Sequence, residues 1–205
     1  MSRLLLIRHG ETKGNSTERF WGRTDVELSS SGIHQVKKLR DHLALENISM
    51  IYSSNLCRAL RTAEIIASRH EVSIVSCREL QEINFGSAEG LTYTEISGKY
   101  PDLASSWFSR DLDFQFPDGE SVTDLNNRVI RFPDRLKEHT EKETIAVTAH
   151  SGVLRLLICN LLGVEPHHWR QIRLDLASLS IIETYPETAI LSSLNDISHL
   201  KAKGG

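Results

Sequence analysis

The sequence is poor in the features that mark several large classes of protein. It has three cysteines, Cys57, Cys77 and Cys159, and none forms the short-spaced pair of a zinc site or a small disulfide framework. No apolar run is long enough for a transmembrane helix, and the run at residues 4–7 is too short for a signal peptide. These absences predict a soluble cytoplasmic protein with reduced thiols, no metal and no membrane segment.

An excess of positive charge is also lacking. The chain has 24 Lys and Arg against 27 Asp and Glu, a formal net charge of -3. A general nucleic-acid-binding surface needs many basic groups, so we expect no nucleic-acid partner and only a local concentration of cations at any anion site. Internal repeats, low-complexity tracts and linkers are absent as well, and the 205 residues are predicted to form a single domain, 1–205.

Hydrophobic periodicity predicts alternating strands and helices. The predicted strands are 4–7, 48–52, 72–75, 144–148, 179–184 and 189–194, with a hairpin-like turn between the last two. The predicted helices follow Ser29–Ser31 and span 56–69, 122–139 and 153–162, and Pro133 should kink or interrupt the third. Such alternation is typical of an α/β layer fold with a mostly parallel sheet, here with one antiparallel strand. A glycine- and aromatic-rich stretch at about 86–120 is predicted to be a packed, cap-like insertion.

Charged side chains stand at or near the ends of several predicted strands. Arg8 and His9 follow the first, Arg58 opens the helix after the second, Glu82 lies beyond the third, and His150 follows 144–148. Ligands of such folds bind at the carboxyl ends of the strands. We therefore expect two arginines, two histidines and one carboxylate to meet in one pocket.

This set of side chains suits phosphoryl transfer, in which positioned cations stabilise the charge of the transition state. Arg8 and Arg58 match phosphate oxygens with planar forks of donors, and the amides of the helices that begin near Arg58 and after His150 would add to them. A neutral His9 is a competent nucleophile, and nearby arginines disfavour its charged form. Glu82 would protonate the leaving oxygen and then activate water, while a cationic or hydrogen-bond-donating His150 would hold the transferring group.

Five motifs, in this order and at this spacing, resemble the histidine phosphatase superfamily over nearly the full length. They are Leu6-Ile7-Arg8-His9-Gly10-Glu11-Thr12 with Asn15, Gly22-Arg23-Thr24-Asp25 with Leu28 and Gly32, Ser53 to Ala63, Leu80 to Gly86 with Glu89-Gly90, and Ala149-His150-Ser151-Gly152. The resemblance implies a three-layer α/β/α, phosphoglycerate mutase-like fold without cofactor or metal.

The resemblance also implies roles for single residues. His9 becomes the nucleophile, Glu82 the proton donor, and Arg8, Arg58 and His150 the phosphate pocket. Asn15 is added as a phosphate contact, and Trp21 and Gly22 as a loop near the substrate. The chain departs from the family at Ser151, where glycine is common and a side chain would reach the pocket rim. It departs again at Ala88, where tryptophan is common and the smaller residue would widen the site.

The stretches Phe85–Gly90 and Phe116–Ser121 most resemble the α-ribazole phosphatase type, which acts late in cobalamin assembly. We therefore predict a metal-independent phosphatase of a small phosphorylated metabolite, with α-ribazole 5'-phosphate as one possible substrate and a monomer or homodimer as its state. The alternatives are a cofactor-dependent phosphoglycerate mutase, a broad sugar-phosphate phosphatase and a non-catalytic module that binds a phosphorylated ligand.

Overall fold

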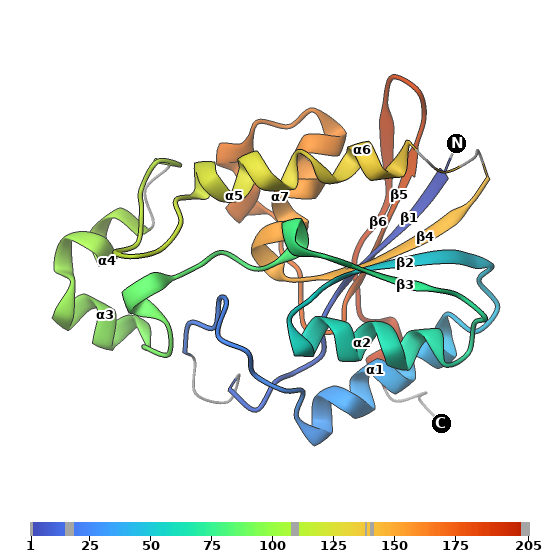
Figure 1. Cartoon of the computed structure of the whole chain (residues 1–205), viewed down its shortest axis with the longest axis horizontal. Helices are drawn as coiled ribbons and strands as arrows, with labels where there is room; N and C mark the ends of the chain where they lie inside the picture. The colour runs from blue at the N-terminus through green and yellow to red at the C-terminus, as the bar shows by residue number, and fades with distance from the viewer. Residues whose placement is uncertain (1, 15–18, 108–110, 138, 140–141, 202–205) are drawn as a thin grey trace.

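A computed structural model describes residues 2–14, 19–107, 111–137, 139 and 142–201 (Figure 1). Its centre is a six-stranded sheet in the order β3-β2-β4-β1-β5-β6. The strands are β1 (Ser2–Arg8), β2 (Ile48–Ser54), β3 (Ile74–Cys77), β4 (Thr144–Ala149), β5 (Leu179–Thr184) and β6 (Ala189–Asp196). β5 runs antiparallel to both β1 and β6, and the other pairings are parallel, so one strand opposes the rest as predicted.

Helices cover both faces of the sheet. α1 (Ser30–His42) and α2 (Cys57–Ala67) pack together on one side, and α5 (Val122–Val129), α6 (Phe132–Leu136) and α7 (Ser151–Leu162) lie on the other (Figure 1). The short 3-10 helices are η2 (Arg78–Leu80), η3 (Gly86–Ala88), η4 (Pro166–Gln171) and η5 (Ser198–Leu200). None of the helices in the described part of the chain is long and apolar enough to cross a membrane.

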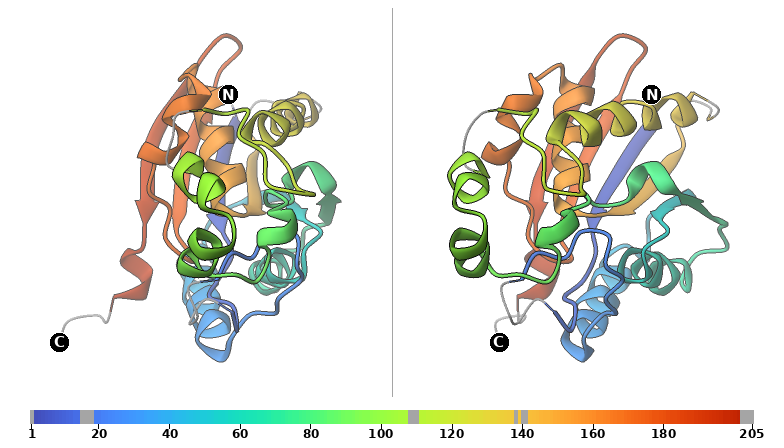
Figure 2. Two further views of the ribbon diagram at one scale, coloured as in Figure 1. Left: turned by 90° about the vertical axis from the view of Figure 1, so that its left-hand side faces the viewer. Right: turned by 60° about the vertical axis from the view of Figure 1, so that its left-hand side comes forward.

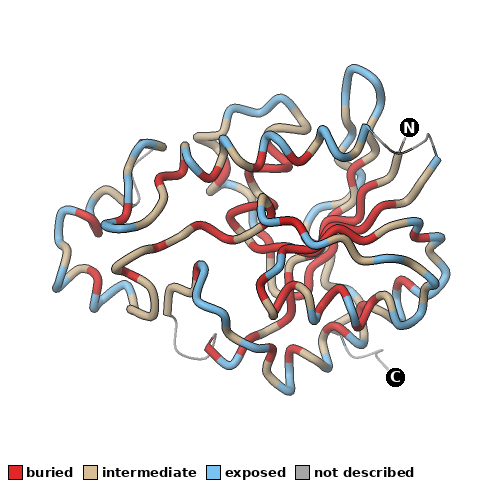
Figure 3. The backbone as a smooth tube through the Cα atoms, in the orientation of Figure 1, coloured by how far each residue is buried: buried red, intermediate tan, exposed pale blue. Residues whose placement is uncertain are grey.

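The alternation of side chains along β1 explains the three layers. Leu5 and Ile7 belong to the same hydrophobic cluster as Val36 of α1, whereas Leu4 and Leu6 belong to the cluster that contains Leu157 of α7. Successive side chains of a strand point to opposite faces, so one apolar strand fills two cores. The central strands are buried along most of their length (Figure 3).

The predicted helix 122–139 is interrupted, as Pro133 suggested. α5 ends at Val129, and α6 begins at Phe132 with the proline in its first turn, where the missing N–H is tolerated. Other boundaries differ slightly from the prediction. β3 begins two residues later than expected, at Ile74, and continues to Cys77, where it pairs with Ser54 of β2.

The segment 86–120 holds α3 (Tyr93–Lys99) and α4 (Pro101–Trp107), which stand away from the sheet (Figures 1 and 2). Aromatic rings join this segment to the rest of the chain. Trp107 meets Phe20, Phe85 and Phe116 edge-on, with ring centroids 5.0–5.7 Å apart. The irregular stretch is therefore packed by its aromatic residues.

Candidate active site

The register of β1 against β4 brings the two histidines together. Arg8 pairs with Ala149 at the carboxyl ends of the two strands, and the next amide, of His9, donates to the Ala149 carbonyl at 3.1 Å. The His9 and His150 rings consequently lie 5.1 Å apart, centroid to centroid. Beside them is a pocket of about 340 Å³ lined by Arg8, His9, Thr12, Arg19, Phe20, Trp21, Arg58, Glu82 and Phe85. Four of the five expected catalytic side chains thus line one cavity.

His9 is held in the tautomer that a nucleophile needs. Its Nδ1 lies 2.7 Å from the carbonyl oxygen of Gly10, which can only accept, so Nδ1 carries the proton and Nε2 keeps its lone pair. Burial, followed by the positive charges of Arg58 and Arg8, holds the pKa of His9 well below its usual value. The arginines act as predicted, although burial is the larger cause. The ring is therefore neutral at neutral pH.

His150 is fully buried, and of the two forms considered from the sequence, a cation or a hydrogen-bond donor, its surroundings favour the neutral donor. Its Nδ1 accepts from Nε of Arg58 at 3.2 Å, so in the neutral ring Nε2 carries the proton and donates to Ser54 Oγ at 2.8 Å. Burial and then the charge of Arg58 hold its pKa well below the usual value. In this arrangement both ring nitrogens are occupied, and the ring orients Arg58.

The two arginines are positioned by backbone carbonyls. Arg8 donates from Nη1 to the Leu174 carbonyl at 2.6 Å, and its buried Nε has no partner among the described residues. Burial lowers the pKa of Arg8 to about 10, partly offset by the nearby Glu82, which still leaves the guanidinium charged at neutral pH. A buried N–H without an acceptor is costly, so an anion in the pocket would stabilise it.

Arg58 is 1% exposed and ties down the loop that carries Trp21. Its Nη1 donates to the Thr24 carbonyl at 3.0 Å, and its Nη2 donates to the carbonyls of Trp21 and Gly22 at 3.3 and 2.5 Å. Burial lowers its pKa, which Glu82 and Asp25 partly oppose. Trp21 lines the pocket, whereas Gly22 is buried behind it and contributes a carbonyl.

Glu82 is placed by two amides. Its Oε1 accepts from its neighbour Ile83 at 3.0 Å, and its Oε2 accepts from Gly152 in the first turn of α7 at 3.1 Å. A side chain at position 152 would place its Cβ 2.5 Å from Glu82 Oε1, so the glycine makes room for the carboxylate. The positive end of α7 therefore faces this carboxylate.

The expected supply of helix amides to a phosphate is wrong for the two amides whose acceptors are known. Gly152 donates to Glu82, and the Cys57 amide at the start of α2 donates to Asp25 Oδ1 at 2.8 Å. One first-turn amide of each helix is thus bonded to a carboxylate of the protein itself. The helix starts follow from local residue patterns, whereas the acceptors of these amides lie 32 and 70 positions away in the sequence.

Three further predicted positions have separate outcomes. Ser151 is the first residue of α7 and is not among the residues lining the pocket. Ala88 is fully buried in the hydrophobic core and does not line the pocket either. Asn15 lies outside the described residues.

Two positioning residues were not identified from the sequence. The Glu89 carboxylate accepts the amides of Gly22, Arg23 and Thr24 at 2.9–3.1 Å, which fixes the loop that Arg58 holds from the other side. Arg128 donates to the carbonyls of Gln81 and Glu82 at 2.5 and 2.8 Å and so holds the segment that carries Glu82. Glu89 belongs to one of the five motifs, but no sequence signal links either side chain to its backbone partners.

The described residues contain one group with metal-ligand spacing, formed by Glu165, His167 and His168. It belongs to η4 and its preceding residue and shares no residue with the pocket. The pocket instead offers charged guanidinium groups, a neutral imidazole and a carboxylate. These groups are suited to binding a phosphoryl group, attacking it and moving a proton.

Comparisons with known proteins agree with this chemistry. A model of the histidine phosphatase superfamily (branch 1) matches residues 4–197, and the chain belongs to this family. It is 32% identical over 200 residues to phosphoserine phosphatase 1 of Hydrogenobacter thermophilus, covering 98% of this chain and 95% of the relative. It is 32% identical over 194 residues to the adenosylcobalamin/alpha-ribazole phosphatase of Escherichia coli, covering 94% and 95%.

A solved structure extends the likeness to the fold. The crystal structure of a putative alpha-ribazole-5'-P phosphatase from Escherichia coli matches with a TM-score of 0.90 and 31% identity, covering 96% of this chain and 97% of that one. The fold is thus a phosphoglycerate mutase-like α/β/α sandwich. With the family and its phosphatase relatives, the chain is a phosphoric monoester hydrolase.

Proposed function

We propose that this enzyme hydrolyses a small phosphomonoester without a metal, through a phosphohistidine formed on His9. The observation that carries the proposal is the Nε2 lone pair of a buried, neutral His9, whose Nδ1 proton is fixed on the Gly10 carbonyl. Arg8, Arg58 and Glu82 line the same pocket, so the nucleophile, the anion-binding groups and the proton donor are together. The single domain 1–205 would then carry the whole catalytic set.

In the first step, His9 Nε2 forms a bond to phosphorus while the bond between phosphorus and the leaving oxygen breaks. Glu82 gives its proton to that oxygen, and the alcohol departs. Both Glu82 oxygens already accept amide hydrogen bonds, so the proton is best delivered by a monoanionic ester that passes it on when it binds. Water then attacks phosphorus, Glu82 takes a proton from it, and the nitrogen–phosphorus bond breaks.

The phosphoryl oxygens would lie between Arg8 and Arg58, with the unpartnered Nε of Arg8 as one donor. His150 would act mainly through Arg58, whose Nε it accepts. Trp21 would bound the substrate side of the pocket, and Gly22, next to it in the same loop, would hold Arg58 through its carbonyl. Asn15 would add a phosphate contact, and Ser151 would stand near the rim.

The wall of the pocket favours an ester with a flat apolar group. Phe20, Trp21 and Phe85 line it beside the catalytic side chains. The additional cation, Arg19, is bonded to Glu95 at 2.7 Å and to the Gly90 carbonyl at 2.5 Å. An aromatic wall suits the benzimidazole of α-ribazole 5'-phosphate. Phosphoserine, which the name of the Hydrogenobacter relative suggests, would need partners for two further charges and is the second candidate.

We also propose that segment 86–120 caps this pocket and that the enzyme acts in the cytoplasm on a small metabolite. Backbone hydrogen bonds between Phe20 and both Gly90 and Leu91 attach the segment to the pocket wall. The three cysteines are free thiols, which suits a reducing compartment.

The covalent mechanism is tested by measuring phosphate release from an aryl phosphate in excess chelator. We expect wild-type activity to survive the chelator and His9→Ala to lose roughly a thousandfold or more in kcat. His34→Ala is the matched control because His34 is exposed on α1. Chelator-sensitive turnover, or a His9→Ala variant with wild-type rate, would refute the mechanism.

A second experiment separates hydrolysis from the mutase alternative. Phosphoryl-labelled substrates, with α-ribazole 5'-phosphate first, phosphoserine second and sugar phosphates and phosphoglycerate as comparisons, are incubated with the enzyme. We expect the label in inorganic phosphate and the highest kcat/KM for the first substrate. Label retained on a rearranged product would instead identify a mutase, and binding without turnover of any substrate would indicate a binding module.

A further inference from the structure

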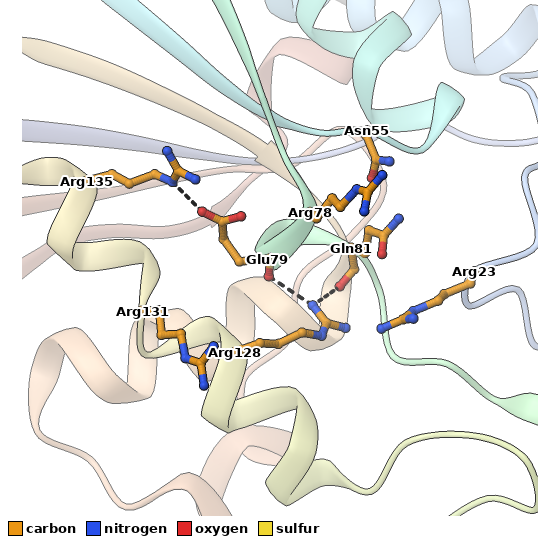
Figure 4. A pocket seen from close by; sticks show the side chains of 8 residues that line it. All are labelled: Arg23, Asn55, Arg78, Glu79, Gln81, Arg128, Arg131 and Arg135. Atoms are coloured by element: carbon orange, nitrogen blue, oxygen red, sulfur yellow. Dashed lines mark hydrogen bonds and ion pairs between the residues drawn. The ribbon is translucent and has the colours of Figure 1, made fainter.

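A second and larger cavity lies outside the candidate active site. Its volume is about 790 Å³, and it is lined by Arg23, Asn55, Arg78, Glu79, Gln81, Arg128, Arg131 and Arg135 (Figure 4). It shares no lining residue with the pocket that holds His9. The mechanism proposed above therefore does not use this cavity.

The cavity has more arginine side chains than there are carboxylates near it to pair with them. Glu79 pairs with Arg135, and Glu120, just outside the lining, pairs with Arg23 and with Arg128. Five guanidinium groups thus share two carboxylates. Arg78 and Arg131 are exposed and have no ion-pair partner among the described residues. In a chain whose net charge is -3, this is a pronounced local excess of positive charge.

The guanidinium groups converge from separate elements. Arg128 lies in α5, Arg131 immediately precedes α6 and Arg135 lies in α6, and all three line the cavity. Arg78 comes from η2, and Arg23 approaches from the loop between β1 and α1 (Figure 4). Asn55 and Gln81 add side-chain amides beside Arg78. The donors therefore come from several elements and face one open hollow.

We propose that this cavity binds a small anion bearing two or more phosphoryl groups. Arginine forks match phosphate oxygens in pairs, and the unpaired Arg78 and Arg131 are free to make such contacts. The volume falls in the range of about 300–1,000 Å³ that small-molecule sites occupy. A concave site walled by several elements suits a compact polyanion better than a duplex nucleic acid, whose phosphates track an extended surface.

Arg128 connects the cavity to the catalytic carboxylate. The same guanidinium lines the cavity and donates to the backbone carbonyls of Glu79, Gln81 and Glu82 at 2.9, 2.5 and 2.8 Å. A polyanion that draws Arg128 toward itself competes with these carbonyls. Occupation of the cavity should therefore change kcat through the position of Glu82, without contact between the anion and the substrate.

Calorimetric titration with methylenediphosphonate, a diphosphate analogue that phosphatases do not cleave, tests the binding site. The proteins are wild type, Arg78→Ala/Arg131→Ala, and the control Arg61→Ala/Arg69→Ala. The control removes two exposed arginines that do not line the cavity. We expect the cavity variant to lose one binding equivalent, or about tenfold or more in affinity, while the control stays within about twofold of wild type.

Equal titrations for wild type and the cavity variant would overturn the proposal. An equal loss of affinity for methylenediphosphonate in both double variants would overturn it too, because it would indicate a general electrostatic effect. Thermal unfolding of each variant verifies that it is folded. The readout is binding and does not require turnover, so failure here is distinguishable from failure of the phosphatase mechanism. A change in kcat for an aryl phosphate that follows saturation of the cavity, and is absent from the cavity variant, would further support the link through Arg128.

Discussion

The candidate proton donor, Glu82, sits where the first turn of a helix has no side chain. The Gly152 amide donates a hydrogen bond to the Glu82 carboxylate. The absence of a side chain at this position also leaves room for the carboxylate, since a Cβ there would lie 2.5 Å from Glu82 Oε1. The atom in the way is the end of a flexible side chain, so a larger residue should move Glu82 and leave the backbone in place. Catalysis and folding can therefore be separated at one position.

We predict that Gly152→Ala will fold normally and lose activity. Alanine is a better helix former than glycine, so the melting temperature should be preserved, whereas displacement of the proton donor should lower kcat by about 10²–10⁴. Gly98→Ala is the matched control because a Cβ there meets nothing within 4 Å. Thermal unfolding and aryl phosphate hydrolysis measure the two effects. An active Gly152→Ala enzyme would mean that Glu82 is not the proton donor.

Single residues also mark the limit of prediction from sequence. Arg8, His9, Arg58 and Glu82 were located because charged residues near strand ends are easily recognised. Their partners were not, since the Leu174 carbonyl that holds Arg8 is 166 positions away in the chain. The choice between a cationic and a neutral His150 was left open for the same reason, because it depends on complete burial beside Arg58.

Helices and strands follow from local patterns more directly. α7 ends at Leu162 because Gly163 takes the left-handed conformation, with φ of 66°. α5 begins at a capping box in which Ser121 and Asp124 exchange hydrogen bonds between side chain and backbone. The break after Val129 was expected from Pro133. The aromatic packing that attaches α4 was predicted only in outline, since ring contacts depend on tertiary placement.

The capping box gives a prediction at this scale. Ser121→Ala removes the acceptor of the Asp124 amide at the start of α5, so the free energy of unfolding should fall by about 1 kcal/mol. Ser105→Ala is the control, because that exposed hydroxyl donates to the Asp102 carbonyl and caps no helix. Urea denaturation compares the two variants. An equal change in the free energy of unfolding in the two variants would show that the capping box makes no specific contribution to stability.

The molecule as a whole buries two neutral histidines beside two arginines. This central arrangement follows from the order of the strands in the sheet. The alternation of strands and helices predicted a mostly parallel sheet, but it did not predict which strands are neighbours. The burial of the two histidines has a consequence for folding. The pKa values of His9 and His150 are both lowered, so the folded protein binds fewer protons than the unfolded chain once the pH falls below the usual histidine pKa of 6.5.

We therefore predict that stability falls as the pH drops through 6.5, by up to about 1.4 kcal/mol per pH unit for each histidine, and that these two groups contribute no slope well above it. Urea unfolding between about pH 7.5 and about pH 5.5 measures the slope. His9→Gln should reduce it, and His34→Gln, which alters an exposed histidine, should not. An unchanged slope in His9→Gln would contradict the prediction.

The loop that Arg58 holds is fixed in large part through its main chain. Arg58 donates hydrogen bonds to the carbonyls of Trp21, Gly22 and Thr24, and the Glu89 carboxylate accepts hydrogen bonds from the amides of residues 22–24. Every residue type supplies a carbonyl, and all except proline supply an amide. Positions 21 and 24 can therefore change their side chains at little cost to the hydrogen bonds that hold Arg58. A family can change what it recognises there while inheriting the same chemistry.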